Sequence, residues 1–244
     1  MKNQLNYQKE LDGLLERLEK ERAVGDSLPR LFLHSCCAPC SSYVLKYLRE
    51  YFRITVFYYN PNISMQEEYR KRVEEQKRLI AAYNAEAEKQ VAEGRNAAKE
   101  YAQREHGEDS GEESRHPCRI DIVEGDYEPE VFFELTKEYA DCPEGGERCF
   151  LCYELRLRRT AQEAKMGGFD YFCTTLSISP LKNAAKINEI GSMLEKEIGV
   201  KWLPSDFKKK DGYKQSVELS RTYDLYRQDY CGCSYSKAER ERRE

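Results

Sequence analysis

The cysteines constrain the fold of this chain more than any other feature, because most of them are grouped rather than scattered. Seven of the ten cysteines in the 244-residue sequence lie in three short motifs, Cys36-Cys37-Ala38-Pro39-Cys40, Cys149-Phe150-Leu151-Cys152 and Cys231-Gly232-Cys233. Closely spaced thiols are typical of metal or redox sites. A fold that uses the three motifs together must bring widely separated segments to one place.

Short apolar runs alternate with helical patterns along the chain. The alternation predicts an α/β fold with a mostly parallel sheet and helices on both faces. We expect strands over 30–34, 53–59, 119–123, 171–175 and 200–203, and helices over 5–23, 41–51, 64–83, 130–140, 148–166, 183–198 and 212–226.

Ligands of such sheets bind beyond the carboxyl ends of the strands. The cysteine turn after residue 34, the Asp126-Tyr127 turn, the loop 177–180 and Asp206 all follow predicted strands. We therefore expect them to share one edge of the sheet.

The predicted elements divide the chain into three parts. Residues 1–29 form an N-terminal helical extension, residues 30–236 a single α/β catalytic domain, and residues 237–244 a charged tail. A polar insertion at about 84–117 is expected to continue a helix and then to form a loose loop around 107–115.

Composition indicates where the protein works. No run reaches the roughly 18 to 20 apolar residues of a membrane span, and the N-terminus lacks the apolar region of a signal peptide. We expect a cytoplasmic protein without a membrane partner, whose thiols stay reduced and serve metal or redox chemistry. A net charge of −4 argues against a protein that simply coats nucleic acid. Glycine-rich phosphate loops for ATP or NAD do not occur.

Two cysteine pairs supply four thiolates. Cys149 and Cys152 lie three residues apart at a helix start, on one face and beside backbone N–H groups that favour anionic sulfur. Gly232 lets the backbone turn so that the sulfur atoms of Cys231 and Cys233 converge. On spacing alone, tetrahedral zinc and an iron–sulfur cube fit these four cysteines equally well.

The first cysteine motif allows two interpretations. A turn at Pro39 can return Cys40 toward Cys36 or Cys37, which would create an open metal or redox site at the strand edge. The alternative is a set of buried free thiols. His34 is expected to be a hydrogen-bonded core histidine, and Cys118, Cys142 and Cys173 to be structural or surface thiols.

Two polar loops carry weaker signals. The segment 174–182 offers hydroxyl groups and a lysine just past a strand, and is either a phosphate or sugar cradle or an ordinary helix cap. The segment 206–214 combines lysines with aromatic residues, as nucleic-acid surfaces do, or is a solvated loop.

Several motifs together resemble one known family, the QueH epoxyqueuosine reductases. The resemblance runs from about residue 30 to 236 and rests on Cys36-Cys37-Ala38-Pro39-Cys40, Glu144-Gly145-Gly146-Glu147-Arg148-Cys149-Phe150-Leu151-Cys152, Thr174-Thr175-Leu176 with Ser179-Pro180, Ser205-Asp206-Phe207-Lys208-Lys209, and Tyr226-Arg227-Gln228 with Tyr230-Cys231-Gly232-Cys233.

The resemblance implies a Rossmann-like fold related to the adenine-nucleotide α-hydrolases. It implies a cobalamin-independent enzyme that removes the epoxide oxygen of epoxyqueuosine at the tRNA wobble position, the last step of queuosine biosynthesis. An electron donor, not identified by the sequence, is a further partner.

The resemblance also implies the ligands. Cys149, Cys152, Cys231 and Cys233 would bind a [4Fe–4S] cluster. Cys36, Cys37 and the residue at position 40 would bind an adjacent mononuclear metal, iron or zinc. Some relatives have Asp at that position where this chain has Cys40, so the ligand set and the identity of the metal stay open.

The expected catalytic residues are Cys36 and Cys37, which the resemblance implies would hold a Lewis-acidic metal, and Asp206, whose position alone suggests a proton donor. Tyr127 and Tyr230 are alternative proton donors. Two rival hypotheses remain. One is a zinc-stapled RNA-binding protein without redox chemistry, and the other is a metal-free thiol redox enzyme that uses Cys37 and Cys40.

Overall fold

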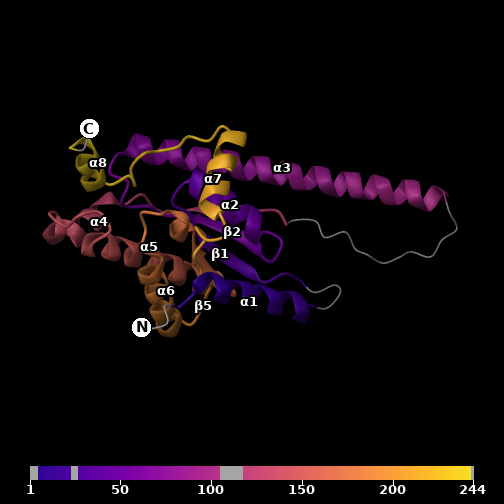
Figure 1. Cartoon of the computed structure of the whole chain (residues 1–244), viewed down its shortest axis with the longest axis horizontal. Helices are drawn as coiled ribbons and strands as arrows, with labels where there is room; N and C mark the ends of the chain where they lie inside the picture. Colours follow the sequence, from indigo (N-terminus) through magenta and orange to yellow (C-terminus); the bar gives the residue numbers. More distant parts are fainter. Residues whose placement is uncertain (1–4, 23–26, 105–117, 243–244) are drawn as a thin grey trace.

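The computed structural model describes residues 5–22, 27–104 and 118–242, with side chains described for 5–22, 27–93 and 118–242. Its centre is a five-stranded sheet, all parallel, in the order β3-β2-β1-β4-β5 (Figure 1). The predicted Rossmann-like α/β fold is confirmed. The strands are β1 (Arg30–His34), β2 (Arg53–Tyr58), β3 (Asp121–Glu124), β4 (Tyr171–Thr174) and β5 (Lys201–Trp202).

Eight α-helices and two 3-10 turns surround the sheet in the described residues. The helices are α1 (Tyr7–Glu21), α2 (Ala38–Leu48), α3 (Gln66–Arg104), α4 (Pro129–Thr136), α5 (Glu147–Met166), α6 (Ala184–Ile198), α7 (Gly212–Thr222) and α8 (Ser234–Glu241), and the 3-10 turns are η1 (Lys137–Tyr139) and η2 (Thr175–Ile178).

The strand order places the helices on two faces. From β1 the chain moves through α2 and α3 toward β3, and it later moves through α6 from β4 toward β5, in the opposite direction. Because such crossovers are right-handed, the two sets of helices fall on opposite faces. Accordingly α2 contacts α3 and α7, whereas α5 contacts α6. The strand order reverses between β1 and β4, which is where ligands of open α/β sheets bind.

Apolar side chains of the central strand build the core. Leu31, Phe32 and Leu33 of β1 are buried, as expected for a parallel strand covered on both faces. Leu11 and Leu15 of α1 belong to the same cluster of buried residues, so the predicted N-terminal helix packs on the body of the protein.

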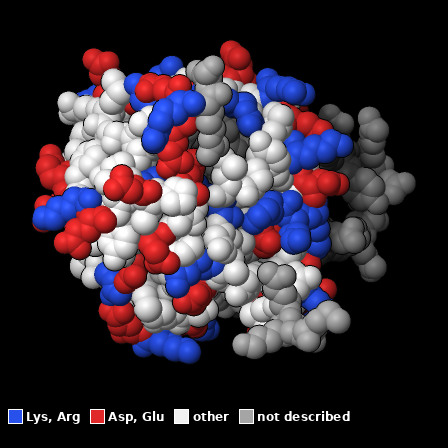
Figure 2. All heavy atoms as spheres, turned by 60° about the vertical axis from the view of Figure 1, so that its left-hand side comes forward, with Lys and Arg blue, Asp and Glu red and all other residues white. Residues whose placement is uncertain are grey.

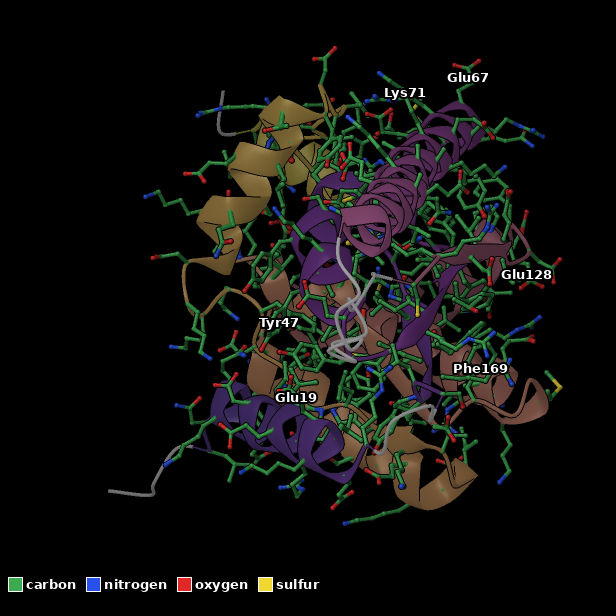
Figure 3. The ribbon with its side chains drawn as sticks, turned by 90° about the vertical axis from the view of Figure 1, so that its right-hand side faces the viewer. Glu19, Tyr47, Glu67, Lys71, Glu128 and Phe169 are labelled. Atoms are coloured by element: carbon green, nitrogen blue, oxygen red, sulfur yellow. The ribbon has the colours of Figure 1, made fainter. Side chains whose placement is uncertain are left out.

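A polar contact also fixes α1. The hydroxyl of Tyr47, which lies in α2 (Figure 3), donates to Oδ1 of Asp12 at 3.2 Å. Lys210 approaches the same carboxylate, with its Nζ 2.7 Å from Oδ2. The N-terminal helix is therefore tied to α2 and to the loop before α7.

The structure differs from the sequence prediction at several element ends. The helix expected from residue 64 begins at Gln66 as α3, and its predicted continuation into the insertion is confirmed, since it runs to Arg104 and extends well beyond the sheet (Figure 1). The predicted loose loop around 107–115 lies outside the described residues. The helix expected over 130–140 ends at Thr136 and tightens into η1, and the helix expected over 212–226 ends at Thr222.

The segment predicted as a charged tail is partly helical. Residues Ser234–Glu241 form α8, whose first turn is capped by Cys233, because its Sγ accepts a hydrogen bond from the backbone N of Ser236 at 3.3 Å. Glu239 of α8 pairs with buried Arg148 at 2.9 Å. Among the described residues, no helix is both long enough and apolar enough to span a bilayer.

Candidate metal centre

Three thiols converge directly after β1. Cys37 is the N-cap of α2, and Pro39 in the first turn sets the helix so that Cys40 faces back toward the strand end. The sulfur atoms of Cys36, Cys37 and Cys40 all lie within 4.8 Å of one another, with 3.9 Å between those of Cys36 and Cys37. The return of Cys40 expected from the Pro39 turn is confirmed, and the three sulfurs can hold one metal ion.

These thiols share protons unequally. Hydrogen bonds from Cys37 and Cys40 hold the pKa of Cys36 well below its usual range. Donation to Cys36 in turn raises the pKa of Cys37 to about 12 and also raises the pKa of Cys40. The protein alone therefore stabilises one thiolate here, and a bound metal would displace the remaining protons.

The second pair of cysteines begins α5. Gly146 is the N-cap of this helix, and the backbone N of Gly145 donates to Sγ of Cys149 at 3.3 Å. Cys152 follows on the same face and is buried, which raises the pKa of its thiol. The predicted backbone N–H contact is confirmed for the sulfur of Cys149.

The third pair reaches α5 from the far end of the chain. Cys152 and Cys233 pack with Phe132 of α4 in one apolar cluster that Cys231 also contacts. The sulfur atoms of Cys231 and Cys233 are 3.3 Å apart, and Gly232 between them has φ 108°. The convergence expected from a glycine at this position is confirmed.

The four cysteines of these two pairs include one close pair of sulfur atoms, those of Cys231 and Cys233, but no close group of three among the described residues. No three of their sulfur atoms lie within 4.8 Å of one another, whereas those of Cys36, Cys37 and Cys40 do, a statement that covers the described part of the chain. A single tetrahedral zinc with 2.3 Å bonds would hold its thiolates about 3.8 Å apart.

Three cations surround the two cysteine sets, and of these the sequence indicated only Lys182, the lysine of segment 174–182. Arg72 of α3 donates to the carbonyl oxygens of Cys231 at 3.3 Å and of Tyr230 at 3.4 Å. Arg156 follows Cys152 by one turn of α5, and its Nε donates to the Cys152 carbonyl oxygen at 3.1 Å. The helical spacing could have revealed Arg156, whereas nothing in the sequence connects Arg72 with the last cysteines.

Lys182 is the third cation. Burial opposes its charge, but Cys231, Tyr153 and Glu144 outweigh burial and raise the pKa of the ammonium group above its usual value. Its Nζ lies 3.4 Å from Oε1 of Glu144. The group therefore stays charged beside the second cysteine set.

A cavity of about 450 Å³ lies between the two cysteine sets. Cys36 and Cys40 line one side and Cys231 another, and all three cations line it as well. The loop after β4 contributes Ser179, Pro180, Leu181 and Lys182, as expected for the carboxyl edge of the sheet.

Several buried polar groups near the thiols have no hydrogen-bond partner among the described residues. They include the hydroxyls of Tyr58 and Tyr153 and Nε2 of Gln76. Tyr58 interacts electrostatically with Cys37, and Tyr153 with Cys149 and Cys152. Buried hydrogen-bond donors beside the cysteines are suited to a bound metal group whose own atoms accept these hydrogen bonds.

The structure does not bring every predicted residue to this cavity. Asp206 does not line it, because its carboxylate pairs with Nζ of Lys208 at 2.6 Å. The Tyr127 hydroxyl donates to the carbonyl oxygen of Ile63 at 3.0 Å. Tyr230 does line the cavity, so the geometry favours Tyr230 among the three predicted proton donors.

Other predicted residues have structural roles. His34 is fully buried, its ring nitrogens lie 2.8 Å from Oγ1 of Thr174 and 3.1 Å from the Tyr59 carbonyl oxygen, and burial lowers its pKa to about 3. The prediction of a hydrogen-bonded core histidine is confirmed. Cys173 is buried in β4, while Cys118 and Cys142 are partly exposed.

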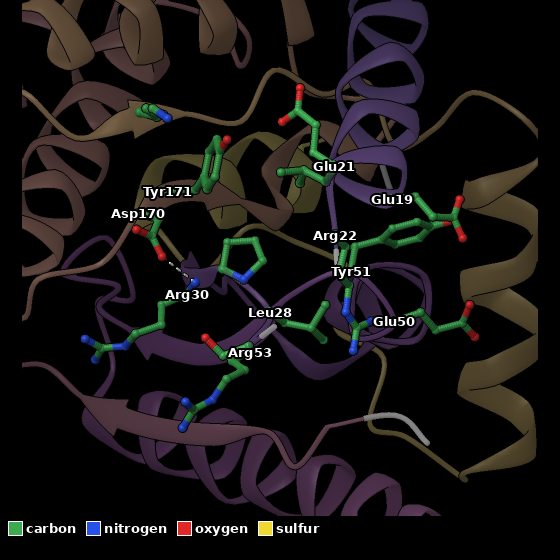
Figure 4. A pocket seen from close by; sticks show the side chains of 14 residues that line it. Glu19, Glu21, Arg22, Leu28, Arg30, Glu50, Tyr51, Arg53, Asp170 and Tyr171 are labelled. Carbon is green, nitrogen blue, oxygen red and sulfur yellow. Dashed lines mark hydrogen bonds between the residues drawn. The ribbon is translucent and has the colours of Figure 1, made fainter. Parts of the chain in front are cut away.

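A second cavity, of about 520 Å³, lies at the opposite edge of the sheet (Figure 4). The first residues of four strands line it, together with four acidic residues that balance its four basic ones. No cysteine lines this cavity among the described residues, so it takes no part in thiol chemistry. The face shown in Figure 2 likewise carries Lys and Arg interspersed with Asp and Glu.

Comparisons with known proteins agree with one another. A family described as epoxyqueuosine reductase QueH matches residues 31–120 and 96–239 in two overlapping segments. The chain is 37% identical over 239 residues to the epoxyqueuosine reductase QueH of Staphylococcus aureus, covering 97% of this chain and 86% of that protein. It is 36% identical over 232 residues to that of Streptococcus pyogenes (95% and 78%) and 35% identical over 210 residues to that of Thermotoga maritima (86% and 91%).

Proposed function

The chain belongs to the QueH family of epoxyqueuosine reductases, and we propose that its reaction takes place in the cavity between its two cysteine sets. The reaction removes the epoxide oxygen of epoxyqueuosine in tRNA and leaves the alkene of queuosine. Its balance is one epoxide, two electrons and two protons in, and one alkene and one water out. The observation that carries the proposal is that thiols of both sets line one cavity.

Cys149, Cys152, Cys231 and Cys233 bind a [4Fe–4S] cluster. The packing of Cys152 and Cys233, with Cys231, in one apolar cluster supports a shared centre, and four cysteine thiolates are the usual ligands of a [4Fe–4S] cluster. The unpaired Tyr153 hydroxyl supports it too, since hydrogen bonds to sulfur are a usual feature of such clusters. The donor set therefore fits the group.

Cys36, Cys37 and Cys40 bind a single metal ion, iron or zinc. Their mutual distances suit three ligands of one ion, and the cavity that Cys36 and Cys40 line would let a substrate oxygen approach such an ion. When bound, the ion supplies a Lewis acid for the epoxide oxygen and the cluster supplies electrons.

Residues of this chain bind the substrate, donate a proton and exclude water. Burial, followed by Glu68, raises the pKa of Tyr230, so its Oη carries a proton at neutral pH that the departing oxygen can take. Lys182 stays charged and offers its Nζ to a polar group of the substrate. Tyr230 and the apolar Leu176 and Ile178 side chains exclude water from the cavity.

The substrate nucleoside is part of a tRNA and must enter the cavity while still attached to it. A volume of about 450 Å³ lies in the range of small-ligand sites, so one nucleoside fits and must leave the anticodon stack to reach the metals. Arg227 and Gln228 line the cavity beside Tyr230 and meet the adjoining nucleotides. Because the substrate is tRNA, we place the reaction in the cytoplasm, where a separate electron donor supplies the two electrons.

Anaerobic purification followed by an ultraviolet–visible spectrum and iron, sulfide and zinc analysis tests this proposal. We expect a brown protein with about four iron and four sulfide per chain plus one further metal. Mass spectrometry of nucleosides should then show epoxyqueuosine in tRNA converted to queuosine when dithionite is added. A colourless protein with stoichiometric zinc, and no iron or sulfide after anaerobic reconstitution, would contradict the cluster and favour a zinc-stapled RNA-binding protein.

A further inference from the structure

Arg156 interacts with both cysteine sets. Its side chain projects from α5 into the interior, is 3% exposed and lines the cavity between the sets. Cys36 of the first set and Cys231 of the last pair line the same cavity, and Nε of Arg156 donates to the carbonyl oxygen of Cys152 at 3.1 Å. The Arg156 guanidinium thus lies between the proposed cluster ligands and the proposed ligands of the single metal.

The hydrogen-bond partners of Arg156 are neutral. Its Nε donates to the Cys152 carbonyl oxygen at 3.1 Å, and its Nη1 donates to Oδ1 of Asn60 at 3.4 Å. No carboxylate oxygen of the described residues lies within 4.0 Å of its nitrogens. A buried cation is costly unless negative charge compensates it, so Arg156 depends on the thiolates.

The other two cations of the site differ in this respect. Arg72 pairs with Glu68 at 2.7 Å, and Lys182 has Glu144 at 3.4 Å. Each of them therefore has a carboxylate partner in addition to the nearby cysteines. Arg156 is the cation of the three that has no carboxylate partner among the described residues, so its charge is compensated at the cysteines alone.

We propose that Arg156 is a positioning residue that holds a fixed positive charge between the two metal groups and raises the reduction potential of the cluster. The inference rests on the proposed function. In the one-electron reduction, an electron from the reductant enters the cluster, which becomes one unit more negative, while the guanidinium keeps its protons and no bond at Arg156 changes. A nearby positive charge stabilises the more negative, reduced form, and net charge is one of the factors that set cluster potentials.

Anaerobic spectroelectrochemical titration of the holoenzyme, followed by electron paramagnetic resonance, measures this effect without an activity assay. In Arg156→Gln we expect at least a tenfold smaller equilibrium constant for one-electron reduction, which corresponds to a midpoint about 59 mV more negative. Arg156→Lys keeps the charge and should remain nearer the wild-type midpoint.

Arg159→Gln is the matched control. Arg159 lies three residues further along α5, is 36% exposed and pairs with Glu163 at 2.9 Å. The reduction midpoint of the cluster in Arg159→Gln should equal that in the wild type.

Each outcome decides the inference. Loss of the cluster in Arg156→Gln with retention in Arg156→Lys supports a requirement for the charge. An unchanged midpoint in a loaded Arg156→Gln, or equal loss of the cluster in both variants, overturns it and leaves only a packing role. A wild-type protein without any cluster contradicts the proposed function instead, so the two failures are distinguishable.

Discussion

Nη1 of Arg72 in α3 lies 3.3 Å from the carbonyl oxygen of Cys231, although the two residues are 159 positions apart in the sequence. The same guanidinium pairs with Glu68 at 2.7 Å and reaches the carbonyl oxygen of Tyr230 at 3.4 Å. Asn62 donates to the Cys231 carbonyl oxygen as well, at 3.1 Å. The loop that carries the last cysteine pair is thus anchored to the start of α3.

Arg72→Met should destabilise the protein and weaken iron binding. The change removes the donors that hold the Cys231 loop and leaves the Glu68 carboxylate without its buried cation, which costs about 3 kcal/mol of unfolding free energy. Chemical denaturation and iron analysis measure both effects. Lys77→Met removes an exposed cation from the same helix and should change stability by about 0.5 kcal/mol or less. Normal iron content in Arg72→Met would show that the anchor is dispensable.

Three alanine variants should separate the two metal groups. Cys149→Ala should lose about four iron and four sulfide, whereas Cys37→Ala should keep the cluster and lose the single metal. Both should lower the reductase rate at least about 100-fold. Cys173→Ala should keep both groups, because the Cys173 thiol donates to the Leu203 carbonyl oxygen at 3.3 Å inside the sheet. Equal metal loss from all three variants would mean that the effect is unfolding, not ligation.

Alkaline pH should weaken the fold through Cys173. Burial raises the pKa of its thiol to about 12, from an ordinary value of 9.0 in the unfolded chain. Between these values the native state keeps the proton that the unfolded state has lost. The contribution of the Cys173 thiol to the free energy of unfolding is therefore complete below about pH 9. It declines as pH rises toward 12, by up to about 1.4 kcal/mol per pH unit. Unfolding curves at pH 8, 9 and 10 should show this extra slope in the wild type and not in Cys173→Ala, and parallel slopes would refute the assignment.

Gly232→Ala should disrupt the last cysteine pair. At φ 108° an alanine is strained, and its Cβ would lie 2.7 Å from Cγ1 of Ile63. Gly199→Ala is the control, because φ is 79° there but the nearest atom to the new Cβ is the flexible Lys165 Nζ at 3.5 Å. Both variants should lose about 1 to 2 kcal/mol of stability from backbone strain, and only Gly232→Ala should also lose iron. Full iron content in Gly232→Ala would show that the turn tolerates a side chain.

The sequence predicted the sheet and the three cysteine groups because both depend on local patterns. Apolar runs alternate with helical segments, and Gly232 and Pro39 mark the turns that bring sulfur atoms together. The end of α3 was less predictable, since its Ala- and Glu-rich stretch favours a helix without a residue that marks where it stops.

Individual side-chain contacts that no motif marks explain what the sequence did not reveal. Arg72 acts through a backbone carbonyl oxygen far along the chain, which no motif encodes. Asp206 follows β5 as expected, but its carboxylate pairs with Lys208, two residues later, outside the cavity. α8 was missed because its cap is the thiol of Cys233, a residue type that rarely marks a helix start.

The separation of the cysteine pairs has a consequence for how the protein is made. Cys231 follows Cys152 by 79 residues in the sequence, as the residue numbers show. At roughly 5 to 20 residues per second, ribosomes need roughly 4 to 16 seconds to synthesise that interval. During this time Cys149 and Cys152 lack Cys231 and Cys233, so their thiols can be oxidised or can bind the wrong metal. Delivery of the proposed cluster would therefore follow translation of the Cys231–Cys233 turn, and cells short of delivery factors should then accumulate folded but iron-poor protein.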